Sequence, residues 1–417
     1  MNSTRARGPI TGSLLVLSAL AAMFVSPAFA GRPSVLVNPH VKGNGTATTI
    51  QEGIDMVDPG GKVMVLPGTY PEQLVIRKGL TLEALAGESS EVILAPPKGS
   101  VIAIDVAGSD PVTIRGIRIE HSGLHGITGT DAVNLTVERI TFVGALAATG
   151  RAVVVLNDAS TSGAQAHLVV RDSYFDLLQH PTTPDGAPQF QNFGITPIGN
   201  VDSLIQNNVV RRAGGACIIV NTTAAIRGET NADVIGNDLD ECYPTARAGS
   251  LLVGPPAGIR PIAPVTATGT VNIIGNIIRN TPGSCRVSSG IDFEMLSGAI
   301  EHNVIEDVVP ACALPSVRNL QAGIWIGSLH SFRGTIGLPP ATPVVRFNDI
   351  SGNAFAGLRV SPDQTVPVEA PCNWWGSSSG PSGIGPGSGD AVVGASSFTP
   401  WATEPIAGQV NPPCSPL

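Results

Sequence analysis

The sequence predicts an all-β fold, a single-stranded parallel β-helix solenoid, and three observations lead to this prediction. A short strand pattern repeats eight times between residues 114 and 350, asparagine holds one place in five consecutive repeats, and an amphipathic turn precedes the first strands. A chain with these features stacks short strands along one axis and needs a cap at each end.

The first thirty residues read as a signal peptide. Arg5 and Arg7 precede the apolar run LLVLSALAAMFV, and the motif SPAFA predicts cleavage after Ala30. The run is too short for a membrane-spanning helix and no second one follows, so we expect no membrane insertion. The mature chain of 387 residues (417 minus 30) is therefore expected to be secreted or periplasmic.

The composition indicates a globular, acidic protein. Loss of Arg5 and Arg7 changes the formal net charge from −8 to −10, which argues against nucleic acid as a partner. Glycine and proline together make 84 residues, below the range of disordered chains, and 42% hydrophobic residues suffice for a core. We expect a monomer.

The repeat has the form apolar-x-x-(apolar or Asn)-x-apolar. It begins at Ile114, Val137, Val170, Ile205, Val234, Ile273, Ile300 and Val345. Most copies are followed by a second short strand, as in G-I-D-F (290–293), G-I-W-I (323–326) and G-L-R-V (357–360). A unit of two or three short strands cannot bury its own apolar face, so it must stack on its neighbours.

Asparagine occupies the fourth repeat position in five consecutive units. These residues are Asn208, Asn237, Asn276, Asn303 and Asn348. Asparagine tolerates the left-handed backbone of a tight turn, and stacked amides can hydrogen-bond along a stack. The alternative, a β-sandwich with asparagine turns, has no reason to keep asparagine in register over five units.

Both ends of the stack are predicted to be covered. Ile50, Ile54 and Val57 set an amphipathic turn ahead of strands at 63–66, 74–76 and 80–82, and a short helix here would protect the open bottom. Residues 31–371 are expected to form the β-helix domain and residues 372–417 a C-terminal cap and tail. There Trp374, Trp375 and Trp401 are expected to form an apolar plug, with a sugar-binding patch as the alternative.

These motifs resemble those of a known superfamily. The T-I-Q-x-x-I-D opening, the P-G-T-Y turn and the I-x-x-N-x-I repeats are similar to those of right-handed parallel β-helix proteins of the pectin-lyase-like superfamily, over roughly residues 45 to 405. The superfamily contains lyases, hydrolases, esterases, epimerases and non-catalytic proteins, so the resemblance implies a fold and not an activity. The motifs of polygalacturonases, pectate lyases and alginate epimerases are missing.

Six cysteines indicate an oxidising compartment. Bridges between neighbouring coils favour the pairs Cys217–Cys242 and Cys285–Cys312, and Cys372–Cys414 would tie down the tail. This is one of fifteen pairings. A metal site is a poor alternative, because there is no C-x-x-C and no histidine at ligand spacing from a cysteine.

One column of residues on the second strands carries the candidate chemistry. The outward positions align as Thr196, Ile219, Leu252, Asp292, Trp325 and Arg359. We predict catalytic roles for Asp292, Arg359 and Glu294, which lies two residues beyond Asp292, and substrate binding for Trp325. Paired carboxyl groups are the minimum for glycoside hydrolysis, and a tryptophan ring suits a sugar face. The competing interpretation is a solvated face with one tryptophan.

No cofactor is expected from the sequence, with calcium left open. Asp238, Asp240 and Glu241 in N-D-L-D-E-C either hold this ion or form a polar turn. The function predicted is action on, or binding of, extracellular polysaccharide. As an enzyme the protein would be a lyase or a hydrolase. The alternative is a non-catalytic β-helix scaffold that binds glycan or a surface partner.

Overall fold

The computed structural model describes residues 32–41, 43, 45–85, 92–147, 149–157, 163–177, 192–221, 229–242, 249–253, 268–283, 287–310, 320–327, 340–362, 364–394, 396–409 and 414. The chain divides after Gly31, and the described elements all belong to the second unit, Arg32–Leu417. The predicted signal peptide lies outside the described residues. No helix in the described ranges is both long and apolar enough to cross a membrane.

Three long sheets, A, B and C, contain nearly all of the described strands. Sheet A has, in spatial order, β2 (Thr46–Ala47), β1 (Ser34–Val37), β3 (Lys62–Val65), β6 (Leu80–Ala84), β9 (Pro111–Arg115), β12 (Asn134–Glu138), β15 (Ala166–Arg171), β18 (Val201–Gln206), β21 (Asn231–Ile235), β24 (Val271–Ile274), β28 (Ser297–Glu301), β32 (Thr342–Arg346), β35 (Val368–Glu369) and β38 (Ser396–Ser397). Sheet B has β4 (Gly68–Tyr70), β7 (Val92–Leu94), β10 (Arg118–Glu120), β13 (Thr141–Val143), β16 (Tyr174–Asp176), β19 (Val209–Arg211), β22 (Asp238–Asp240), β25 (Ile277–Arg279), β29 (Val304–Glu306) and β33 (Asp349–Ser351).

Sheet C carries the outward column that the sequence singled out. Its strands are β5 (Leu74–Ile76), β8 (Ile102–Ala107), β11 (His125–Thr130), β14 (Arg151–Asn157), β17 (Phe193–Gly199), β20 (Ile218–Val220), β23 (Gly249–Val253), β27 (Val287–Phe293), β31 (Leu320–Ile326), β34 (Leu358–Val360), β37 (Gly389–Val393) and β36 (Pro381–Gly383). A small fourth sheet pairs β26 (Thr281–Gly283) with β30 (Val308–Pro310).

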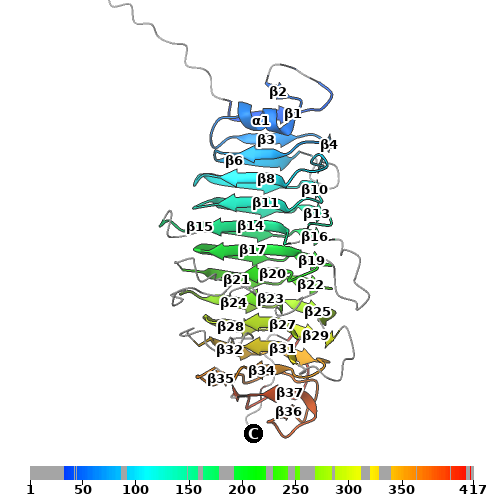
Figure 1. The fold of residues 1–417 in the computed structure, drawn as a ribbon, viewed down its shortest axis with the longest axis vertical. Coiled ribbons are helices and arrows are strands. Elements are labelled where there is room, and N and C mark those ends of the chain that lie inside the picture. The colour runs from blue at the N-terminus through cyan, green and yellow to red at the C-terminus, as the bar shows by residue number, and fades with distance from the viewer. Residues whose placement is uncertain are drawn as a thin grey trace, which may run out of the picture. The chain divides into compact units, whose positions relative to one another are not determined.

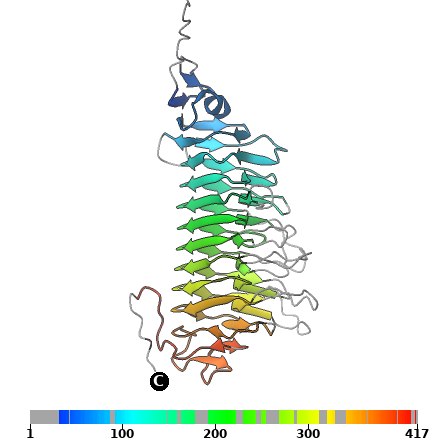
Figure 2. The same cartoon turned by 90° about the vertical axis from the view of Figure 1, so that its left-hand side faces the viewer.

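The chain runs through sheets A, B and C in turn and then starts the next coil. Each strand pairs in parallel with its counterpart one coil away, as in Val112↔Leu135 and Leu135↔Leu168. Figure 1 shows the coils stacked from β3 to β36, and Figure 2 shows the same stack from the side. The inward valine, isoleucine and leucine side chains form one continuous core. The predicted parallel β-helix is confirmed.

The asparagine column forms a continuous hydrogen-bonded ladder at the corner between sheets A and B. The Nδ2 of Asn237 donates to Asn276 Oδ1 at 2.9 Å, and the backbone N–H of Asn237 donates to the same oxygen at 2.9 Å. The other ladder residues repeat both bonds with the next coil. Asn373, in the N-W-W-G stretch, ends the ladder by accepting from Asn348 at 2.9 Å.

The expected reason for this column was partly wrong. The left-handed backbone belongs to the residue just before each ladder asparagine: φ is 54° at Asn207, 65° at Gly236 and 57° at His302. Asparagine suits this position because its buried side-chain amide hydrogen-bonds to backbone groups on two coils. An apolar residue would leave these backbone groups without hydrogen-bond partners.

A short helix lies at the N-terminal end of the stack, where the sequence predicts a capping helix. Helix α1 (Ile50–Met56) begins at Thr49, whose hydroxyl accepts from the backbone N–H of Glu52. Ile50 and Ile54 point into the core. A Cβ on Gly53 would lie 2.8 Å from a methyl group of Val37, so glycine allows the helix to lie close to β1.

Glu72 anchors this cap from the neighbouring coil. Its carboxylate accepts from the backbone N–H groups of Ile50 at 2.7 Å and Gln51 at 2.8 Å, at the positive end of the helix. We expect Glu72→Ala to lower the free energy of unfolding by about 2 kcal/mol. Urea unfolding checks this, with Glu120→Ala, which removes an exposed ion pair, as the control. An equal, small effect of both variants would mean that Glu72 does not hold the cap.

The C-terminal end is closed by tryptophan and tied by a disulfide. Trp375 is fully buried in the core, and Trp401 packs against the core beside Phe398. Trp374 is half-buried. The Asp349 carboxylate accepts from the backbone N–H groups of Ile406 and Ala407. Sheets A and C continue past residue 371 through β37 and β38.

Two of the three expected disulfides are confirmed. Cys217–Cys242 lies in the core with Cα atoms 5.6 Å apart, and Cys372–Cys414 has a separation of 5.2 Å. Cys285 and Cys312 lie outside the described residues. The two observed bridges fit an oxidising compartment.

Candidate functional site

The strands of sheet C share a local pattern that fixes which side chains face outward. A small residue is followed by an inward apolar residue and then by an outward one, as in Gly290, Ile291 and Asp292. The small residue is required because a Cβ on Gly290 would lie 2.8 Å from the carbonyl oxygen of Gly323 on the next coil.

The predicted outward column is confirmed by the strand register. Ile219 pairs with Leu252, Leu252 with Asp292, Asp292 with Trp325, and Trp325 with Arg359. These residues therefore lie on successive coils at the usual strand spacing of about 4.8 Å. Thr196 belongs to the same column, because its neighbour Ile195 pairs with Ile218, and the register continues the column on earlier coils through Val154, Thr128 and Asp105.

All of the column from Thr196 to Trp325 is buried and Arg359 is partly exposed, which differs from the solvated face considered from the sequence. Asp292 is 0% exposed and Trp325 is 4% exposed, although both face away from the core. Ile219 and Leu252 pack with Ala216 in one small apolar cluster, and Trp325 packs with Ala322 and Ala356 in another. Alternation along a strand predicts which way a side chain points but not whether it is covered. The sequence pattern therefore did not predict that these outward side chains are buried.

Asp292 is the most unusual ionisable group on this face. Neither carboxyl oxygen has a hydrogen-bond partner among the described residues. Burial raises the pKa of Asp292 well above its ordinary value, and the nearby carboxyl group of Glu294 raises it further. Both effects favour the neutral carboxylic acid over the carboxylate in the folded chain.

Glu294 extends the same outward face just past β27. Its backbone N–H donates to the carbonyl of Val253 at 2.8 Å, so the pairing between coils continues to this residue. The side chain is 1% exposed. Two residues of extended chain span about 6.6 Å, so Asp292 and Glu294 lie at neighbouring positions on the same outward face.

Trp325 and Arg359 form a stacked pair above Asp292. The guanidinium carbon of Arg359 lies 5.3 Å from the Trp325 ring centroid, a cation–π contact that covers one ring face. Burial lowers the pKa of Arg359 from its ordinary value. The indole Nε1 of Trp325 has no hydrogen-bond partner among the described residues, and it remains a free donor at the site.

A second polar group on sheet C was not predicted. His125, Arg151 and Phe193 lie in register on three successive coils, in the column formed by the residue before each small residue. The column predicted from the sequence starts at Thr196, so the same corner on two earlier coils, marked by Gly126 and Ala152, lies outside the prediction.

The acidic residues considered for calcium lie in a network of polar contacts on sheet B. Asp238 accepts from Arg279 at 2.8 Å and Asp240 accepts from Asn280 at 2.8 Å. Glu241 follows β22 with a left-handed backbone, φ 52°. Within the described ranges, no group of three or more His, Cys, Asp or Glu side chains is placed to hold a metal ion.

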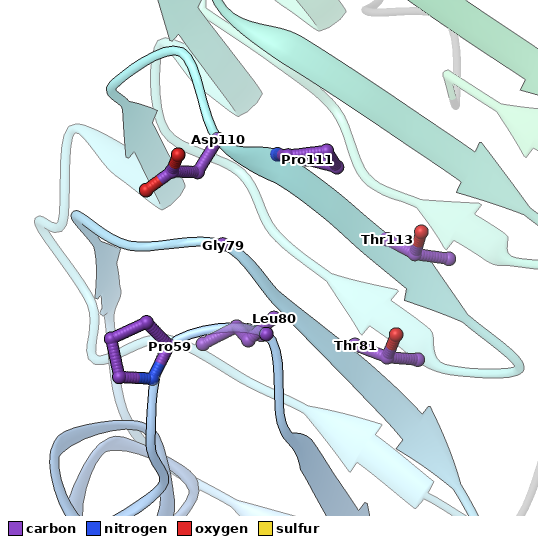
Figure 3. A pocket seen from close by; sticks show the side chains of 8 residues that line it. Pro59, Gly79, Leu80, Thr81, Asp110, Pro111 and Thr113 are labelled. Carbon is purple, nitrogen blue, oxygen red and sulfur yellow. The ribbon is translucent and has the colours of Figure 1, made fainter.

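A shallow hollow of about 420 Å³ lies elsewhere, on sheet A near the N-terminal end. Figure 3 shows Pro59 and Asp110 at one side of it and Thr81 and Thr113 on neighbouring strands at the other. Asp110 is its one charged lining residue, and the hollow contains none of the predicted site residues.

Comparison with known proteins finds similarity to solved structures only. No family model and no curated protein matches the chain. Among solved structures, the A-module of mannuronan C-5 epimerase AlgE4 from Azotobacter vinelandii matches 84% of this chain and 94% of its own length, at 15% identity and a TM-score of 0.48. A mannuronic acid specific family 6 polysaccharide lyase from human gut microbiota matches 81% and 78%, at 11% identity and a TM-score of 0.33. These similarities concern the fold alone. With its three parallel sheets in register, the chain is a parallel β-helix protein.

Proposed function

We propose that this protein acts on an extracellular polysaccharide and that its site is the outward face of sheet C around Asp292. The observation that carries the proposal is the Asp292 carboxyl group: it is fully buried, has a raised pKa and has no described hydrogen-bond partner. An unpaired buried carboxyl group costs stability, and such groups are found where chemistry needs them.

The proposed reaction is hydrolysis of a glycosidic bond. Asp292, held protonated, donates its proton to the leaving oxygen, and Glu294 acts as the second carboxyl group, either as base or as nucleophile. The unpartnered Nε1–H of Trp325 donates to a saccharide oxygen, and Arg359 keeps the indole in place. Because Asp292 and Trp325 are buried, the face must open before a polymer reaches them.

Binding without turnover is the second candidate. It is favoured by the absence from the sequence of the catalytic motifs that polygalacturonases, pectate lyases and alginate epimerases carry. For either candidate, we propose that the chain is exported through its N-terminal signal sequence. The two disulfides support this location.

A screen of the purified protein against soluble polysaccharides tests the proposal. We expect new reducing ends without the ultraviolet absorbance of unsaturated products. Unsaturated products would instead mean β-elimination and would assign the chemistry to Arg359 as base. No product at all, with retarded migration in a glycan affinity gel, would replace hydrolysis with the binding candidate.

A further inference from the structure

Arginines on the outer faces of sheets A and B have carboxylates within reach. Arg115 donates to Glu83 at 2.7 Å, Arg171 to Glu138 at 2.8 Å and Arg212 to Asp176 at 2.8 Å, each on an adjacent coil. Arg279 and Arg346 make similar contacts with Asp238 and Glu301. Each of these five guanidinium groups thus contacts a carboxylate on a neighbouring coil.

Arg151, on the outer face of sheet C, is different. No described carboxylate lies within ion-pair distance of it, and its Nε is buried without a partner. Its Nη1 donates to the carbonyl of Thr149 at 3.0 Å, and its guanidinium carbon lies 5.4 Å from the Phe193 ring centroid. Burial lowers the pKa of Arg151, which reflects the cost of an unpaired guanidinium there.

His125 adds a second basic group directly below Arg151. The two residues pair between β11 and β14, and the Nδ1 of His125 is also buried without a partner. Burial, then Arg151 and His121, lower the pKa of His125 to about 4. The carboxylate of Asp105 on this face is already engaged by Arg77 and Thr128. The Arg151 guanidinium thus has no described counter-ion, and the His125 ring stacked on it, which is neutral near neutral pH, has an unpartnered Nδ1.

We propose that Arg151 and His125 bind a carboxylate group of a saccharide ligand that lies along the outward face of sheet C. The Arg151 Nε–H and a ring N–H of His125 supply two donors, and the guanidinium supplies the charge. Arg151 and Asp292 lie four coils apart on this face, about 19 Å, so one polymer is long enough to reach both once the face around Asp292 opens. The saccharide nature of the ligand rests on the proposed function. The anion site does not require catalysis.

The test is the affinity of the full protein for polygalacturonate and alginate, each compared with the same polymer after its carboxyl groups are reduced to alcohols. We expect the wild type to prefer the carboxylated polymers, and Arg151→Gln to lower that affinity about tenfold or more. Affinity for the reduced polymers should be low and equal in both proteins. Arg118→Gln, which removes one positive charge from an exposed pair on sheet B, should bind as the wild type does.

Three further measurements distinguish a lost binding site from misfolding and from non-specific anion binding. The thermal midpoint of each variant checks folding, and His125→Asn, the second variant, should show the same selective loss. Equal binding of wild type and Arg151→Gln to the carboxylated polymers, including no binding by either, overturns the proposal. Arg151-dependent binding to dextran sulfate alone overturns the carboxylate assignment.

Binding measured in an Asp292→Asn background separates this site from the proposed hydrolysis. Arg151-dependent binding without any cleavage by the wild type supports the anion site and rejects hydrolysis. Cleavage of a polymer whose binding does not depend on Arg151 supports hydrolysis and rejects the anion site.

Discussion

Replacing Asp292 by asparagine is expected to lower the rate of polysaccharide cleavage by a factor of about 10² to 10⁴, the usual contribution of a general acid. Asparagine has nearly the same shape as a protonated aspartic acid, so packing under Trp325 should be preserved while the transferable proton is lost. The measurement is the rate of reducing-end formation on the polymer that the wild type cleaves.

Asp202→Asn is the matched control for this variant. Asp202 lies on β18, facing outward from sheet A, with a side chain 53% exposed, and it should leave the rate unchanged. Glu294→Gln, which removes the second carboxyl group, should also be strongly impaired. An Asp292→Asn protein that cleaves at the wild-type rate would remove Asp292 from the mechanism.

Loss of one asparagine from the ladder is expected to cause the largest loss of stability. Asn276→Ala removes the acceptor of two Asn237 donors and the donor to the Val234 carbonyl and Asn303. At about 1–3 kcal/mol for each buried group left unpaired, we expect the free energy of unfolding to fall by about 4 kcal/mol or more. Urea unfolding, followed by circular dichroism, measures this.

The comparison is with Asn272→Ala, four residues earlier on the same coil. Asn272 faces outward, donates to Asp233 and accepts from the backbone N–H of Ala299. Because water can replace these partners, we expect a loss below about 1 kcal/mol. Similar losses in the two variants would mean that the ladder has no special role.

Strand direction and register could be predicted from the sequence because they depend on local periodicity. The Asp292–Trp325–Arg359 column followed from aligning three short strands, and the register agrees. Asn373 was not predicted to belong to the ladder, because it lies in a glycine-rich tail and is not part of a copy of the strand repeat. Only the hydrogen bond from Asn348 identifies it.

Burial of the site and the unmatched charge on Arg151 could not be predicted in the same way. Whether an outward residue is covered depends on segments distant in sequence, and the apolar neighbours Ile219 and Leu252 were the one available hint. The missing counter-ion of Arg151 becomes visible only when strands β8, β11 and β14 are in register. Both the burial of the site and the missing counter-ion depend on tertiary contacts, which the periodicity of the sequence does not reveal.

The most direct test of the central claim, that Asp292 is kept protonated at a functional site, is the stability of the wild type and Asp292→Asn as a function of pH. A free aspartate has a pKa near 3.9. Above this pH the unfolded chain releases a proton that the folded chain keeps, which destabilises the wild type by up to about 1.4 kcal/mol per pH unit until the folded pKa is reached. Asparagine carries no such cost.

The account predicts that the advantage of Asp292→Asn over the wild type in free energy of unfolding is small near pH 4 and grows as the pH rises toward 7. A difference that stays constant over this range would show that Asp292 has an ordinary pKa in the folded chain and would contradict the account.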